Sequence, residues 1–217
     1  MICGAANTEE GVARDTVLRI GQAWSKRGIG QAFAIKNLLS FGLHAFGATS
    51  SPAGVADGRF FAWLAQAQWA HRVSFGRSDG QVILRSDAQF AKSPLLGLEK
   101  FAIGGHSTVR GYLENELVRD DGVIGSAELR APIFSRNDGA TSLEVAPFVD
   151  IGSGWNLHHL SGDHQTLPSA GIGLRGKLLN RLQAEIYWGH PFAERLRPLE
   201  QNLQSHGIHA GIIWKAP

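Results

Sequence analysis

The clearest structural signal in this chain is RFFAWLAQAQWAHR at residues 59–72. Phe61 and Trp63 occupy positions of one parity, whereas Gln66 and Gln68 occupy the other. Successive side chains of a β-strand point to opposite faces of a sheet, so this period of two predicts a strand with one apolar and one polar face. A run of about ten such residues is long enough to cross a lipid bilayer as a tilted strand.

Similar runs recur along the chain, separated by segments rich in Gly, Pro, Asn, Asp and His, and no useful helical period accompanies them. The alternation predicts nine strands, at residues 16–25, 32–46, 59–72, 81–90, 122–133, 142–155, 169–178, 181–190 and 207–215. The turn-forming composition predicts loops at residues 47–58, 113–121, 135–141, 156–168 and 191–206.

Composition narrows the class of protein further. The 217 residues are 43% hydrophobic and include 27 Gly and 6 Trp, yet no apolar stretch approaches the roughly 20 residues of a membrane-spanning helix. The polar faces carry Gln, Arg, Ser, Gly and His rather than many Lys and Glu, which favours the wet interior of a membrane β-barrel. A soluble lectin-like β-protein, with Trp-rich faces that bind a ligand, is the alternative class. The formal net charge of +2 gives no indication of a nucleic-acid partner.

Several kinds of chemistry find little support. Cys3 has no second cysteine in the chain with which to form a disulfide. The Gly-rich segment 104–111 is not followed by Lys-Ser or Lys-Thr, so it is not a phosphate-binding P-loop. His158, His159 and His164 share one loop, but no carboxylate or thiol set completes a tetrahedral metal site. Without a nucleophile elbow either, we expect no catalysis, no metal and no cofactor.

Two short motifs are more informative. The first is FAIGGHSTVRGY at residues 101–112, in which Gly104, Gly105 and Gly111 allow sharp turns around Val109, Arg110 and Tyr112. The second is FVDIG at residues 148–152, which sets Phe148, Asp150 and Gly152 in an alternating run. A permanently charged guanidinium on a loop and a carboxylate on a strand can form a bidentate ion pair. The alternative is that the two are unrelated, solvated charges.

Strand parity supports the ion pair. If Val149 and Ile151 face lipid, then Phe148, Asp150 and Gly152 face inward. By the same argument, an outward Leu129 turns Glu128 and Arg130 inward, as additional charges near the same wall.

These motifs and the strands between them resemble the haemolysin activation/secretion protein family (ShlB/FhaC/HecB), the transporters of two-partner secretion. The resemblance runs from about residue 16 to the C-terminus and includes GYLENE at 111–116, SAELRAP at 126–132, and the closing segments 169–175, 187–191 and 203–209. It implies a 16-stranded antiparallel outer-membrane β-barrel, preceded by two polypeptide-transport-associated (POTRA) domains and a plug helix. It also implies that the Arg110 loop folds into the barrel lumen and meets Asp150.

The resemblance further implies a function and partners. The protein would secrete or activate a large exoprotein of haemolysin or adhesin type in the outer membrane of a Gram-negative bacterium. Its partners would be that exoprotein, outer-membrane lipid and the barrel-assembly machinery.

The chain corresponds to about the last nine strands of such a barrel, so residues 1–217 are expected to be its C-terminal part, without a signal peptide or POTRA domains. The alternatives are a barrel-assembly protein of the BamA type and a non-functional truncated remnant.

Overall fold

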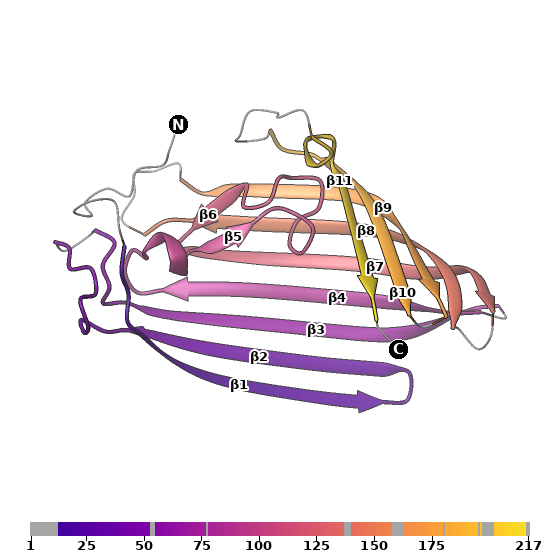
Figure 1. The fold of residues 1–217 in the computed structure, drawn as a ribbon, viewed down its shortest axis with the longest axis horizontal. Helices are drawn as coiled ribbons and strands as arrows, with labels where there is room; N and C mark the ends of the chain where they lie inside the picture. The colour runs from indigo at the N-terminus through magenta and orange to yellow at the C-terminus, as the bar shows by residue number, and fades with distance from the viewer. Residues whose placement is uncertain are drawn as a thin grey trace.

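The computed structural model describes residues 13–52, 55–76, 78–136, 140–157, 163–179, 181–194, 196 and 202–215. They form a nine-stranded antiparallel sheet and a separate two-stranded hairpin (Figure 1). The strands of the large sheet lie in chain order: β1 (Val17–Gly28), β2 (Gln31–Gly42), β3 (Phe61–Phe75), β4 (Ser78–Ala91), β7 (Asp121–Arg136), β8 (Thr141–Trp155), β9 (Gln165–Leu178), β10 (Leu182–Pro191) and β11 (Ile208–Trp214).

The nine predicted strands are confirmed, and so is the all-β antiparallel class, although the strand predicted at residues 32–46 ends at Gly42. Each strand pairs with its sequence neighbour, except that β4 pairs with β7 across the inserted hairpin. Within the part of the chain that the structure describes, β1 and β11 each have one neighbour only, so the sheet is open. Figure 1 shows it strongly curved, with β10 and β11 turning across one side.

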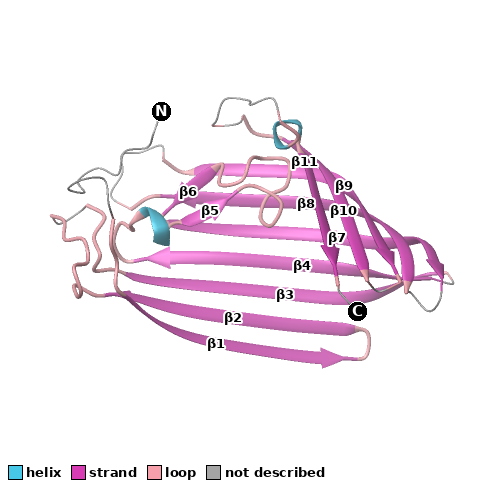
Figure 2. Cartoon of the chain, in the orientation of Figure 1, coloured by secondary structure: helices cyan, strands magenta, loops and turns pink. Residues whose placement is uncertain are grey.

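The two ends of the sheet differ in their connections. At one end the strands are joined by short turns, such as residues 29–30 between β1 and β2. At the other end the connections are longer, such as residues 43–60, and one of them contains the short 3-10 helix η3 (Gln204–His206) (Figure 2).

Strand alternation sorts the side chains of the sheet between two faces. The face that we call outer exposes apolar side chains: Leu18, Ile20, Trp24, Trp63, Leu84, Val149, Ile151, Ile172, Leu174, Ile186, Trp188, Ile212 and Trp214. The opposite, inner face carries Asp150 and Glu128, which are buried. Asn37 is a polar exception on the outer face, and its Oδ1 accepts a hydrogen bond of 3.2 Å from the indole Nε1 of Trp63.

The hairpin of β5 (Phe101–Ile103) and β6 (Leu117–Arg119) corrects the sequence analysis, which placed residues 113–121 in a loop. Strands of three residues are too short to display a period of two. The prediction of a loop at 156–168 was also too long, because β9 begins at Gln165. The turn predicted at 135–141 is shorter as well, since β7 reaches Arg136 and β8 begins at Thr141.

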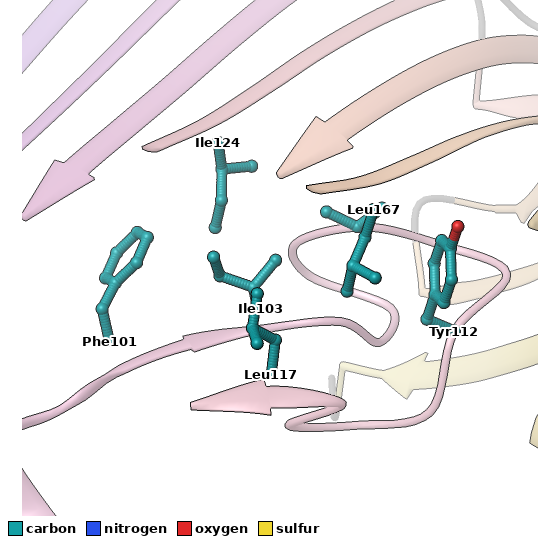
Figure 3. Packing of buried hydrophobic residues seen from close by; sticks show 7 residues of the cluster. Phe101, Ile103, Tyr112, Leu117, Ile124 and Leu167 are labelled. Carbon is teal, nitrogen blue, oxygen red and sulfur yellow. The ribbon is translucent and has the colours of Figure 1, made fainter. Parts of the chain in front are cut away.

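The principal core lies between this hairpin and the inner face of the sheet. Figure 3 shows side chains of the hairpin gathered against Ile124 of β7. The cluster consists of Phe101, Ile103, Val109, Tyr112, Leu117, Ile124 and Leu167. Burial of such side chains stabilises the inserted segment on the sheet, at about 1.5–3 kcal/mol for each large one.

Among the described residues, no helix is both long enough and apolar enough to span a membrane.

Candidate functional site

The loop between β5 and β6 carries the first motif, and we call residues 104–112 the motif loop. Its sharp turns depend on glycine, because Gly104, Gly105 and Gly111 have φ angles of 110°, 100° and 95°, a region that other residues rarely adopt. The Thr108 hydroxyl stabilises the first turn: it accepts from the Gly104 N–H at 2.9 Å and donates to the Gly104 carbonyl at 2.8 Å. The turns direct the next residues onto the inner face of the sheet.

Gly152 of the second motif provides space for this segment. A Cβ added to Gly152 would lie 2.4 Å from Ile103 Cγ2 and 2.8 Å from Val109 Cγ2. Both neighbours are completely buried. The glycine therefore allows the hairpin and the motif loop to pack closely against β8.

Arg110 and Asp150 are in direct contact. The guanidinium donates to both carboxylate oxygens, from Nε to Oδ2 at 2.8 Å and from Nη2 to Oδ1 at 2.9 Å. The backbone N–H of Arg110 also donates to Oδ2 at 3.1 Å. Arg110 is 2% exposed and Asp150 3% exposed, so water screens this bidentate pair very little.

Further groups on β7 complete the ion pair. Arg110 Nη1 donates to Glu128 Oε2, and the second oxygen of Glu128 accepts from Arg130 Nε at 2.6 Å. Ser126 Oγ donates to Asp150 Oδ1 at 2.7 Å. The cations Arg130 and Arg110 thus alternate with the anions Glu128 and Asp150. Their mutual attraction offsets much of the desolvation cost of burying these charges.

Two aromatic rings bound the guanidinium of Arg110. Its Cζ lies 3.7 Å from the ring centre of Phe148 and 4.8 Å from that of Tyr187, a cation–π arrangement. Burial lowers the pKa of Arg110, but the hydrogen bonds and charges of Asp150 and Glu128 outweigh it and raise the pKa above the ordinary value. The group is therefore charged at every physiological pH.

Tyr112 fixes the other end of the motif loop. Its ring is completely buried, and its hydroxyl donates to the Pro168 carbonyl at 2.8 Å and accepts from the Ala193 N–H at 3.0 Å. The motif loop is thus tied to β9 and to the segment after β10 as well as to β7 and β8.

Two cavities flank the tip of the motif loop. Ser107 borders both of them. The first, of about 650 Å³, is lined by charged side chains that include Arg130, Glu144, Arg175, Lys177 and Glu185. The second, of about 470 Å³, lies along β1 to β4 and is lined by Lys36, Gln66, Gln68, Arg85 and Asp87 among others. The inner face beside the loop is therefore polar and of mixed charge.

The structure brings all the sequence-predicted site residues into one region: Gly104, Gly105, Val109, Arg110, Gly111, Tyr112, Glu128, Arg130, Phe148, Asp150 and Gly152. Sequence reasoning missed Ser126, Tyr187 and His209. Alternation could have identified Tyr187, because an outward Trp188 turns it inward. Of the loop histidines, His164 contacts Ser153 Oγ at 3.0 Å, whereas His158 and His159 lie outside the described residues. The described residues contain no group of three potential metal ligands.

Comparison with known proteins identifies a matching family and a solved structure with a similar fold. The family model described as haemolysin secretion/activation protein ShlB/FhaC/HecB matches residues 11–176. The solved structure of CdiB from Escherichia coli is similar to this chain, with a TM-score of 0.71 and 21% sequence identity. The match covers 91% of this chain and 36% of CdiB, so the chain spans little more than a third of that protein's length. No curated protein matches the sequence.

Proposed function

Since the chain belongs to the haemolysin secretion/activation protein family ShlB/FhaC/HecB, we propose that it forms the C-terminal part of an outer-membrane β-barrel that secretes a partner exoprotein. The observation that carries this proposal is the buried contact between Arg110 and Asp150. It fixes a loop against the inner wall of a curved sheet whose outer wall is apolar. A loop held inside a barrel by one cluster of charges can control access to the lumen.

The two faces of the sheet suit this role. Exposed Trp63, Leu84 and Val149 match the lipid-facing band of a membrane barrel. The inner face offers Gln66 and Gln68 beside charged groups of both signs, a wet surface that an unfolded chain can pass without binding tightly. Because barrels of this kind carry short turns on the periplasmic side, the end with the longer connections would face the exterior.

The proposed mechanism involves positioning and movement rather than covalent chemistry. The motif loop occupies part of the lumen while Arg110 is bound to Asp150 and Glu128. Displacement of the loop would open a path for an unfolded exoprotein of haemolysin or adhesin type, whose folding outside the cell drives its export. The partners in this scheme are the exoprotein, the outer-membrane lipid and the machinery that assembles the barrel.

Fractionation and secretion together test the proposal. We expect the protein in the outer membrane, with migration on a gel that changes on heating, and we expect a large protein to disappear from the culture medium of a deletion strain and return on complementation. Recovery of the folded protein in the soluble fraction would contradict the barrel. An unchanged medium, combined with loss of other outer-membrane barrels from the deletion strain, would favour a role in barrel assembly instead.

A further inference from the structure

The backbone of the motif loop rests directly on a glycine of β10. A Cβ added to Gly189 would lie 2.8 Å from the nitrogen of Gly111 and 2.9 Å from the carbonyl carbon of Arg110. In the reverse direction, a Cβ on Gly111 would lie 3.0 Å from the Gly189 carbonyl oxygen. The two main chains are therefore so close that neither position accommodates a larger residue without displacement.

A third glycine supports this contact from the position just before β11. Gly207 has a φ of 75°, and its carbonyl accepts a hydrogen bond of 2.9 Å from the Gly189 N–H. A Cβ added to Gly207 would lie 2.1 Å from the Gly189 carbonyl oxygen and 3.6 Å from Gly111 Cα. We call Gly111, Gly189 and Gly207 the glycine contact.

His209, two residues further along, binds the motif loop itself. Its Nε2 accepts the backbone N–H of Gly111 at 3.1 Å, and the side chain is 3% exposed. An imidazole nitrogen can accept a hydrogen bond only when it carries no proton. The contact therefore requires neutral His209 with its proton on Nδ1.

We propose that the glycine contact and His209 form a second anchor for the motif loop, separate from the ion pair of Arg110 with Asp150, and that protonation of His209 releases it. Arg110 attaches the loop to β7 and β8 through its side chain, whereas Gly111, the next residue, attaches it to β10 and β11 through its backbone. The loop thus connects two pairs of neighbouring strands that β9 separates in the sheet. His209, Gly189 and Gly207 are positioning residues, because they act through the loop.

The charges around His209 determine what protonation does. Its surroundings contain groups of both signs from the loop, β8 and β10: His106, Arg110, Glu114, Asp150, Glu185 and Tyr187. Asp150 is already bound by Arg110, and Glu185 by His106 and Arg175. A proton on Nε2 would replace the acceptor of the Gly111 N–H with a second donor, so the hydrogen bond would be lost.

Hydrogen exchange at the Gly111 amide measures this anchor directly. We expect its protection factor in the full-length protein, corrected for intrinsic exchange, to fall by about two- to tenfold when one hydrogen bond is lost. In the parent this fall should occur on acidification, when Nε2 of His209 gains a proton. His209→Leu should lose the protection at every pH. His209→Gln, whose amide oxygen can accept the same N–H, should keep it at every pH.

Glycine variants test the close packing without removing the acceptor. Gly189→Ala should lower Gly111 protection at least as far as His209→Leu, whereas Gly176→Ala, with no atom closer than 3.9 Å to the added carbon, should not. Protection that survives in His209→Leu would overturn the anchor, and protection in the parent that is independent of pH would overturn its release by protonation.

Any effect of the second anchor on secretion rests on the proposed function. A secretion assay of the same variants, run in parallel, tests the anchor and the proposed function separately. If Gly111 protection falls in His209→Leu while secretion is unchanged, the second anchor stands and its role in secretion fails. If protection is unchanged, the anchor fails whatever the secretion level.

Discussion

Arg110 binds the carboxylate of Asp150 with both its guanidinium and its own backbone N–H. The loop cannot leave β8 by a side-chain rotation alone, because the main-chain hydrogen bond would remain. Release requires the whole segment to move, so the contact fixes the position of the loop as well as the conformation of one side chain.

Removal of either partner should impair secretion. Truncation of one member of a buried pair costs roughly 3–5 kcal/mol, against about 0–1 kcal/mol for an exposed pair. We expect Arg110→Ala and Asp150→Ala each to reduce secretion strongly while the barrel still folds and reaches the membrane. The double variant should be no worse than the worse single variant, because both remove the same contact. Fully additive effects, or parental secretion by Arg110→Ala, would show that the residues act separately.

Lysine should replace the function of Arg110 only in part. A lysine ammonium is a compact charge that cannot donate in parallel to Asp150 and also reach Glu128 while stacking on Phe148. We expect Arg110→Lys to secrete at a level between those of the parent and Arg110→Ala. Arg72→Lys, at an exposed arginine, serves as the control and should secrete normally. Parental secretion by Arg110→Lys would mean that charge alone suffices.

A methyl group at position 152 should disturb the packing of the motif loop. In Gly152→Ala the new carbon would collide with Ile103 and Val109, and overpacking of this kind costs about 1–3 kcal/mol. We expect lower thermal stability and greater trypsin cleavage after Arg110. Gly125→Ala is the matched control on the neighbouring strand, since its added carbon meets Ile151 Cγ2 at an ordinary 3.5 Å. Equal behaviour of the two variants would rule out Gly152 as the close-packing position.

Charged substitutions distinguish a lipid-facing sheet from a water-facing one. Val149 is 56% exposed on the outer face, and an arginine there would cost about 2–4 kcal/mol at the middle of a bilayer but little in water. We expect Val149→Arg to reduce folding into lipid vesicles, whereas Gln68→Arg, on the inner face, should fold nearly as well as the parent. Normal folding of Val149→Arg would contradict the membrane orientation.

The open edges of the nine-stranded sheet lead to a prediction about the isolated chain. In lipid, the unpaired N–H and C=O groups along the free edges of β1 and β11 would each cost several kcal/mol. We expect the 217-residue chain, expressed by itself, to aggregate or to pair with other chains. A stable monomeric pore in planar bilayers would refute this expectation.

The strands and the orientation of Asp150 could be predicted because they depend on local alternation. Side chains two residues apart share a face wherever the strand lies, so an outward Val149 determines that Asp150 points inward. The hairpin of β5 and β6 escaped prediction, since three residues carry no measurable period. Its formation depends on the apolar surface that Ile124 and Leu167 present beneath it.

The contacts of the motif loop likewise include some that were predicted from the sequence and others that only the tertiary structure reveals. Local parity turned Glu128 inward, and the family resemblance supplied the pairing of Arg110 with Asp150. The approach of Gly189 and His209 to Gly111 has no counterpart in any short stretch of sequence, because 98 residues separate Gly111 from His209. The curvature of the nine-stranded sheet brings β10 and β11 round to the loop, and that curvature is a collective property of strand twist and pairing.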